Sequence, residues 1–363
     1  MVQANFSKVS EFLEKSVENK KVPGVVAGVT TSEKLIYKEA FGYAHYDQKI
    51  RMMENTIFDL ASLTKVVSTL PSILQLLDEG LLDLDDPIYY YLNSFEKNHS
   101  DVTIKHLLTH TSGFQPGIEF HLQKVDRKDA IEVIAQIIDR KQVGEVVIYS
   151  DLNYILLGAI VERIIDQSID LYTKKSLFKP LGMENTTFNP PEKDKKRIAA
   201  TEFMESIQDY QWGKVHDENT YQFGGVSGHA GLFSTLEDLA IYARMLLNDG
   251  QYKGKQILTP QSIKLSTQSF TSQLNLNRGL GWELYSSPSF SGQFLQDGFG
   301  HTGFTGTSIW ISKKGGYAVI ILTNRVHFGR DNNIGRLRRI THNLIANSME
   351  QFHIENGDTK CLR

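Results

Sequence analysis

A serine and a lysine three residues apart, Ser62 and Lys65, are the side chains in this sequence best suited to covalent chemistry. Residues at this spacing lie on one face of an α-helix, about one turn apart. A lysine shielded from water loses part of its preference for the charged form, so it can accept a proton from the serine hydroxyl. The pair therefore predicts a serine nucleophile activated without histidine, as in an acyl-transfer enzyme.

The same spacing occurs twice more, at Ser94 with Lys97 and at Ser176 with Lys179, so spacing alone is weak evidence. Only Ser62 opens a run of apolar residues at helical spacing, formed by Val66, Val67, Leu70, Ile73, Leu74 and Leu77. The Ser62 hydroxyl is thus expected at a helix N-terminus, where free backbone N–H groups favour developing negative charge.

Size and composition describe an ordinary globular enzyme. The chain has 363 residues, of which 40% are hydrophobic and 22% charged, and this length favours two domains or lobes. A formal net charge of −3 without a stripe of Lys and Arg argues against nucleic acid as a partner. The sequence does not indicate an oligomeric state.

The single cysteine, Cys361, excludes a disulfide framework and a thiolate metal site. No apolar run is long enough to span a bilayer, and the first residues lack a basic stretch followed by an apolar one. We therefore expect a cytoplasmic protein, although an exported protein whose leader had been removed would look the same.

The elements that must position Ser62 change in type along the chain. Near the N-terminus the pattern predicts a helix at 5–19 and strands at 24–31 and 35–43. The middle is mostly helical, with helices expected at 128–140, 151–166 and 236–249. Strands return at 280–285, 307–312 and 317–323, before a last helix at 334–346.

This order predicts an α/β fold whose antiparallel sheet, flanked by helices, is built from both termini and carries an inserted helical domain. We expect residues 1–60 and 275–363 to form the sheet domain and residues 61–274 the mainly helical domain. The active site is expected where the two meet.

Two further short segments are candidates for the site. Tyr149-Ser150-Asp151 precedes a strong helix, with Asp151 a plausible N-cap, and His301-Thr302-Gly303 precedes Phe304 and a strand. Small residues there would let a substrate backbone approach the strand edge. Taken singly, the first segment can also be a packed aromatic and a cap, and the second a glycine-rich turn.

Together the three segments resemble the class C β-lactamase and penicillin-binding-protein superfamily, in the order Phe58–Lys65, Tyr149–Asp151 and His301–Gly303. Flanking segments agree, at 76–87, 104–113, 231–235 and 322–325, so the resemblance spans residues 20 to 345. It implies the β-lactamase/transpeptidase-like fold described above.

The resemblance also implies roles. Ser62 would be the acylated nucleophile, Lys65 its proton acceptor, and Tyr149 a second acid–base group. The backbone N–H groups of Ser62 and Phe304 would form the oxyanion hole, while Thr302 and Gly303 would contact substrate. No cofactor or metal is implied, and the partner would be a small molecule or a peptidoglycan fragment.

Two departures from the family pattern bear on activity. Asp151 stands where the family usually has asparagine, and a carboxylate cannot donate an amide N–H to substrate, although it could hold Lys65 charged and shift the base role towards Tyr149. His301 stands where lysine is most common and is mostly neutral at pH 7. Both argue against efficient β-lactamase activity. His-Thr-Gly does occur in D-alanyl-D-alanine peptidases and esterases of this superfamily.

The segments 224–231 and 324–327 resemble hydrolases of bacterial cell-wall metabolism, including N-acetylmuramyl-L-alanine amidases. Arg325 could bind the substrate carboxylate in place of His301, or form a structural ion pair at a strand end. If His301 itself must be protonated to bind a carboxylate, kcat/KM should fall above about pH 6.5.

The leading hypothesis is therefore a serine hydrolase acting on a cell-wall peptide or amide, or on a small ester. A penicillin-binding sensor that is acylated without turnover remains an alternative. A metal hydrolase using His106 and His110, four residues apart, lacks a glutamate and a third ligand.

Overall fold

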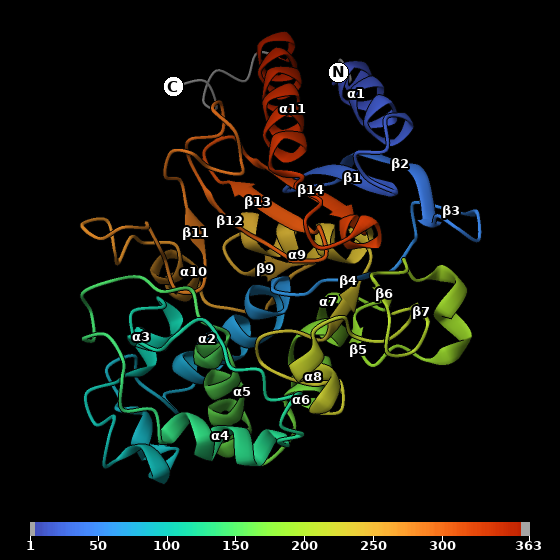
Figure 1. The fold of residues 1–363 in the computed structure, drawn as a ribbon. Coiled ribbons are helices and arrows are strands. Elements are labelled where there is room, and N and C mark those ends of the chain that lie inside the picture. Colours follow the sequence, from blue (N-terminus) through green and yellow to red (C-terminus); the bar gives the residue numbers. More distant parts are fainter. Residues whose placement is uncertain (1–3, 357–363) are drawn as a thin grey trace.

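The computed structural model describes residues 4–356, so Cys361 lies outside the described part of the chain. Within these residues the main sheet has seven antiparallel strands in the spatial order β11-β12-β13-β14-β1-β2-β3. The strands are β1 (Gly24–Thr31), β2 (Leu35–His45), β3 (Ile50–Arg51), β11 (Glu283–Leu284), β12 (Phe299–Thr302), β13 (Ser308–Ser312) and β14 (Tyr317–Thr323). Because β1 pairs with β14, the predicted sheet built from both ends of the chain is confirmed (Figure 1).

Both faces of the central strands are covered by helices, which explains why β1 and β14 read as continuous apolar runs. Helices α1 (Ser7–Glu18) and α11 (Gly335–Glu355) lie on one face and α9 (Leu236–Leu247) on the other. Gly28 allows α9 to approach closely, since a Cβ there would lie 2.7 Å from the Leu236 side chain. Helix α11 extends beyond the expected end at 346, because Met349 continues its buried face.

The rest of the chain is mainly helical. Its α-helices are α2 (Leu70–Asp78), α3 (Ile104–Leu108), α4 (Arg127–Ala135), α5 (Asp151–Ile165), α6 (Ile169–Thr173), α7 (Lys179–Leu181), α8 (Glu218–Gln222) and α10 (Pro260–Ser266). Short strands are β4 (Phe58–Asp59), β5 (Thr187–Phe188), β6 (Phe203–Met204), β7 (Asp209–Tyr210), β8 (Leu232–Ser234), β9 (Gln251–Tyr252) and β10 (Lys255–Gln256). Single π or 3-10 turns are η1 (Lys65–Thr69), η2 (Ile88–Tyr90), η3 (Asn93–Phe95), η4 (Lys174–Phe178), η5 (Glu192–Arg197) and η6 (Arg325–Phe328). The division into domains at residues 61 and 274 stays a prediction, and α9 of the middle segment packs on the sheet.

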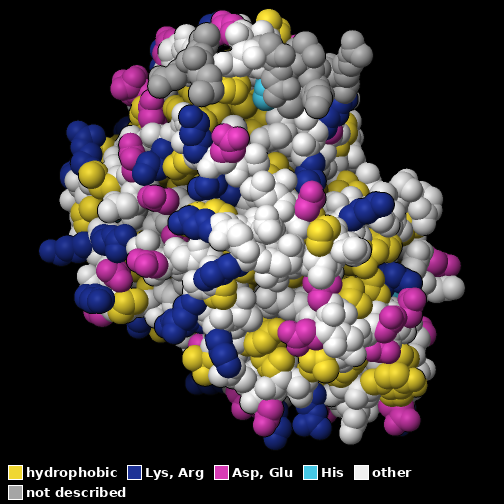
Figure 2. Space-filling model, turned by 180° about the vertical axis from the view of Figure 1, so that it is seen from behind, with side chains coloured by type: hydrophobic (Ala, Val, Ile, Leu, Met, Phe, Trp, Pro, Cys, Tyr) yellow, Lys and Arg dark blue, Asp and Glu magenta, His cyan; other side chains and the backbone are white. Residues whose placement is uncertain are grey.

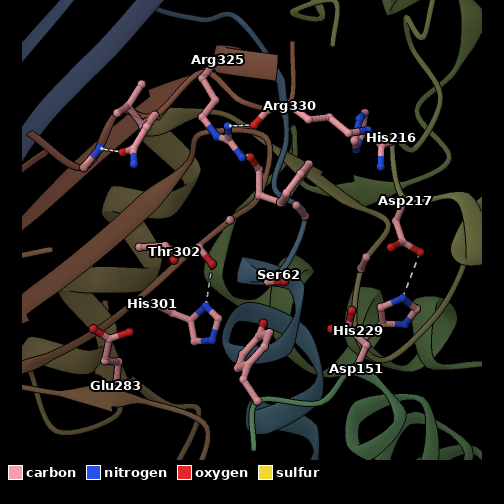
Figure 3. A pocket seen from close by; sticks show the side chains of 18 of the residues that line it. Ser62, Asp151, His216, Asp217, His229, Glu283, His301, Thr302, Arg325 and Arg330 are labelled. Carbon is pink, nitrogen blue, oxygen red and sulfur yellow. Dashed lines mark hydrogen bonds and ion pairs between the residues drawn. The ribbon is translucent and has the colours of Figure 1, made fainter. Parts of the chain in front are cut away.

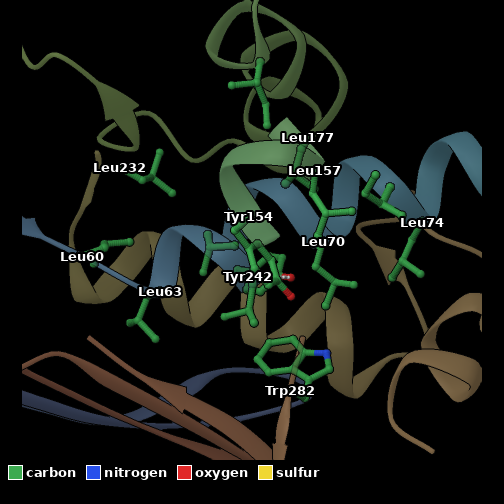
Figure 4. Packing of buried hydrophobic residues seen from close by; sticks show 14 of the residues in the cluster. Leu60, Leu63, Leu70, Leu74, Tyr154, Leu157, Leu177, Leu232, Tyr242 and Trp282 are labelled. Atoms are coloured by element: carbon green, nitrogen blue, oxygen red, sulfur yellow. Dashed lines mark hydrogen bonds between the residues drawn. The ribbon is translucent and has the colours of Figure 1, made fainter. Parts of the chain in front are cut away.

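The helix that begins after Ser62 is anchored in the largest apolar cluster. Leu63, Leu70 and Leu74 on this helix pack among buried residues of α5, α9 and the sheet, including Tyr154 (Figure 4). The Tyr242 hydroxyl of α9 donates to the Val66 carbonyl at 2.6 Å. Rotation of this helix would cost buried apolar area, so packing sets the direction in which Ser62 points.

Strand β12 is a difference from the sequence prediction. It carries Gly300 and the polar residues His301 and Thr302, so it lacks the alternation that predicts strands, and pairing with β13 makes it extended. The strand expected at 280–285 is reduced to Glu283–Leu284, after Gly281 with a φ of +75°.

The described helices include none with the length and apolar character needed to cross a membrane. On the face shown in Figure 2, basic and acidic side chains are interspersed.

Candidate active site

The backbone immediately before Ser62 is held in an uncommon conformation. Ala61 has a φ of +47°, a region that residues with a Cβ rarely adopt. The Asp59 carboxylate accepts hydrogen bonds from the N–H groups of Ala61 (2.9 Å) and His216 (2.6 Å). Burial raises the pKa of Asp59 even though both N–H groups oppose it. This local turn brings Ser62 to the wall of a cavity of about 700 Å³.

Lys65 is completely buried beside the serine. Its Nζ donates to Ser62 Oγ at 3.0 Å and to the His229 carbonyl at 3.1 Å, and it lies 2.7 Å from Asp151 Oδ1. Burial alone would lower the pKa of Lys65, but Asp151 and then Tyr149 outweigh it, so the net direction is upward. This direction favours the alternative in which Asp151 holds Lys65 charged over the one in which shielding makes Lys65 a free amine.

Tyr149 lies against Lys65, whose Nζ is 5.0 Å from the centre of its ring. On the other side, the His110 ring lies 4.6 Å from the Tyr149 ring, centre to centre. The Tyr149 hydroxyl is itself buried, and it contributes after Asp151 to the raised pKa of Lys65. Tyr149 thus lies directly beside Lys65, and its acid–base role stays a prediction.

Helix α5 begins at Asp151, and Ser150 rather than Asp151 occupies its N-cap position. The Ser150 N–H donates to His110 Nδ1 at 3.2 Å, and the Asp151 N–H donates to the Pro116 carbonyl at 2.8 Å. His106 instead caps α3 through Thr103. The two histidines of the suspected zinc spacing are therefore engaged separately in structural contacts.

His301 lies on β12 across the cavity from Asp151, with Ser62 between them (Figure 3). Its Nδ1 donates to the Thr302 carbonyl at 2.7 Å, which leaves Nε2 as an acceptor without a partner among residues 4–356. Burial, and then the charges of Arg278 and Lys65, hold the pKa of His301 well below its usual value. The lowered pKa favours the neutral form of His301 over a protonated carboxylate anchor.

The turn after β12 is joined to the segment before Ser62. Thr305 Oγ1 donates to the Asp59 carbonyl at 2.7 Å, and Thr307 Oγ1 donates to the Leu60 carbonyl at 3.0 Å. At Gly303 a Cβ would lie 2.1 Å from Thr307 Oγ1, so only glycine fits this contact.

The two backbone donors of the expected oxyanion hole are unoccupied by other described groups. Neither the Ser62 N–H nor the Phe304 N–H donates to any residue in the 4–356 range. Both residues line the cavity, and Phe304 is 46% exposed. This arrangement is compatible with the predicted oxyanion role.

Arg325 differs from one of the two alternatives expected for it, the structural ion pair, while its role as carboxylate anchor stays a prediction. Its Nε donates to the Phe304 carbonyl at 2.9 Å, and its Nη1 donates to the carbonyls of Arg330 (2.7 Å) and Asn332 (2.6 Å). Within residues 4–356 it forms no ion pair. Arg325 thus holds backbone around the cavity through its Nε and Nη1 atoms.

Sequence reasoning missed several charged residues that line the cavity, among them Arg278, Glu283 and Arg338. Arg278 is only 6% exposed, and among described groups its Nε and Nη1 have no hydrogen-bond partner. Its Nη2 is 3.9 Å from Glu283 Oε2, beyond hydrogen-bond distance. No motif marks these positions, because they come from a loop, a strand and a helix that only tertiary packing brings together. We call Ser62, Lys65, Tyr149 and Asp151 the lysine wall, and Arg278, Arg325, Arg338 and His301 the arginine wall.

One group of possible metal ligands occurs among the described residues, formed by Asp151, Asp217 and His229 with ligand atoms within 4.8 Å of one another. These atoms are already engaged, since Asp151 pairs with Lys65 and His229 Nε2 hydrogen-bonds Asp217 at 3.0 Å. The hydrogen bond between His229 and Asp217 fixes the position of His229, whose carbonyl accepts a hydrogen bond from Lys65 Nζ. We interpret the group as part of the hydrogen-bond network around Lys65.

Comparison with known proteins agrees with this geometry. The sequence profile of the Beta-lactamase family matches residues 9–342. The chain belongs to the β-lactamase family. A relative from Escherichia coli O157:H7, named as a D-alanyl-D-alanine carboxypeptidase, is 34% identical over 344 residues, covering 84% of this chain and 79% of that protein.

An N-acetylmuramyl-L-alanine amidase of Bacillus subtilis (strain 168) is 32% identical over 359 residues, covering 88% of this chain and 81% of that one. Among solved structures, a class C β-lactamase from Rhodobacter sphaeroides superposes with a TM-score of 0.76 at 20% identity, covering 93% of this chain and 98% of the other. The structural match supports the fold, and the family supports a hydrolase.

Proposed function

We propose that this member of the β-lactamase family hydrolyses an amide or peptide bond in fragments of the bacterial cell wall through an acyl-enzyme on Ser62. The observation that carries the proposal is the buried Lys65 ammonium, which contacts Ser62 Oγ at 3.0 Å and Asp151 at 2.7 Å on the cavity wall. The names of the carboxypeptidase and amidase relatives support the substrate class.

In the proposed reaction, Ser62 Oγ bonds to the substrate carbonyl carbon, and the amine leaves with a proton relayed through Tyr149. A water molecule then attacks the acyl-enzyme and releases a carboxylic acid and free Ser62. Because Asp151 keeps Lys65 charged, the ammonium lowers the cost of the developing alkoxide, and the proton-accepting role moves towards Tyr149.

The test is a time course of intact-protein mass after mixing with benzylpenicillin, a D-alanyl-D-alanine peptide or a muramyl-L-alanyl peptide, with Ser62→Ala as the control. We expect a Ser62-dependent acyl adduct and turnover of one of the two peptides. Turnover retained by Ser62→Ala would refute the proposal. A lasting penicillin adduct without hydrolysis of any peptide or ester would identify a sensor, and turnover confined to short esters would identify an esterase.

A further inference from the structure

Two arginines hold consecutive carbonyl groups in the turn that follows β12. Arg338 on α11 donates from Nη2 to the carbonyls of Gly303 (3.3 Å) and Thr307 (2.8 Å). Arg325 on η6 donates from Nε to the carbonyl of Phe304 (2.9 Å). The two cations therefore bind neighbouring peptide groups of one tight turn.

The contact at Gly303 has a specific consequence for Phe304. The Gly303 carbonyl and the Phe304 N–H belong to the same peptide group, which is planar and trans, so they point in opposite directions. A donor that holds the carbonyl therefore also sets the direction of the N–H. Among described residues this N–H has no partner, and Phe304 lines the same cavity as Ser62.

A hydrogen bond to the Gly303 carbonyl matters because glycine permits a wide range of backbone angles, so the peptide group that follows it can rotate. Within the turn, the Gly303 carbonyl is also bound by the Gly306 N–H at 3.1 Å, but Gly306 is itself a flexible residue with a φ of +123°. Arg338 supplies an anchor from a different element. Its own position is tied to α11, where its carbonyl accepts from His342 Nδ1 at 2.8 Å.

We propose that Arg338 is a positioning residue of the active site: by binding the Gly303 carbonyl it keeps the Phe304 N–H turned into the cavity as an oxyanion donor. The inference rests on the proposed function, since an oxyanion forms only if Ser62 attacks a carbonyl. It assigns a task to helix α11, which contributes no residue of the three sequence motifs.

The experiment compares Arg338→Gln and Arg338→Lys with Arg336→Gln, which removes an exposed arginine from the same helix. Folding of each variant is checked by circular dichroism and thermal unfolding. Each is assayed with a substrate that carries a free carboxylate and with its neutral amide. We expect Arg338→Gln to lower kcat about 10- to 100-fold, somewhat less than complete loss of an oxyanion donor, for both substrates.

A positioning role further predicts that KM changes less than about threefold, because the N–H acts mainly on the transition state. Arg338→Lys should recover part of the loss, since an ammonium can still donate to one carbonyl, and Arg336→Gln should leave kcat unchanged. A loss confined to the KM of the carboxylate substrate would overturn the proposal, because Arg338 would then be a substrate anchor. Wild-type kcat in Arg338→Gln would overturn it as well.

A crystal structure of Arg338→Gln separates this inference from the proposed function. We expect the Gly303–Phe304 peptide to rotate so that its N–H leaves the cavity, and a peptide in its original orientation would refute the positioning role. If Ser62→Ala retains turnover, the proposed function fails, while the peptide orientation still shows whether Arg338 holds this turn.

Discussion

The two walls of the cavity differ in how their positive charges are paired. On the lysine wall, the buried cation of Lys65 is neutralised directly by Asp151 at 2.7 Å. On the arginine wall, Arg325 and Arg338 bind backbone carbonyls and Arg278 keeps two donors without a hydrogen-bond partner in the described chain. We therefore expect the first wall to serve proton transfer and the second to attract negatively charged groups of a substrate.

This difference accounts for the two departures from the family motifs. Asp151 stands where the family usually has an amide and pairs with Lys65, while arginines from other elements line the cavity near His301, whose pKa is lowered. Substitutions can therefore be made in each wall separately. We expect those in the lysine wall to change the chemical step and that of Arg278 to change substrate binding.

The largest effect is expected from removing the cation of the lysine wall. Lys65→Met should lower kcat/KM at least about 1000-fold, because Ser62 loses its only charged neighbour within hydrogen-bond distance among the described residues. Steady-state kinetics would measure the loss. Lys179→Met, an exposed lysine of another Ser-x-x-Lys spacing, is the matched control and should retain wild-type activity. A small effect of Lys65→Met would remove the lysine wall from the mechanism.

Asp151→Asn should have the next largest effect. It restores the usual family residue but removes the main charge that raises the pKa of Lys65, so that pKa should fall. We expect kcat/KM at pH 7 to drop about 10- to 100-fold. An NMR titration of labelled lysine Nζ would follow the pKa, and an unchanged Lys65 titration would contradict the assigned ion pair.

On the arginine wall, Arg278→Gln should weaken binding instead of chemistry. A buried guanidinium with unpaired donors attracts anions, so KM for a carboxylate-bearing substrate should rise about 10-fold, with little change for its neutral amide. Arg330→Gln is the control, because Arg330 already pairs with Glu202 and Glu218. Equal effects on both substrates would show that Arg278 is not selective for charge.

The smallest effect concerns His301. Its pKa is lowered, so it is neutral above that value and gains a proton only in acid below its usual range. Between pH 6 and 8 it should therefore add no slope to the pH profile of kcat/KM, and His301→Gln should change kcat/KM less than about threefold at both ends. A wild-type profile that falls above pH 6.5, and becomes flat in His301→Gln, would show that the protonated form acts after all.

Much of the fold could be predicted from sequence because local patterns report local structure. The apolar runs of β1 and β14 and the helical spacing after Ser62 are properties of neighbouring residues. Ser62, Lys65, Tyr149 and His301 were found because motif order is also a property of the chain, and the structure places all four around one cavity or in direct contact with its wall.

What the sequence alone determined, then, is most of the elements, though not β12, and which side chains are candidates for the chemistry. Only the tertiary structure decided their charge states and the partners of the arginines. The pKa of Lys65 depends on a carboxylate 86 positions away, and Arg338 meets the Gly303 carbonyl 35 positions away. Such contacts depend on burial and distance in three dimensions, which neither residue type nor spacing encodes.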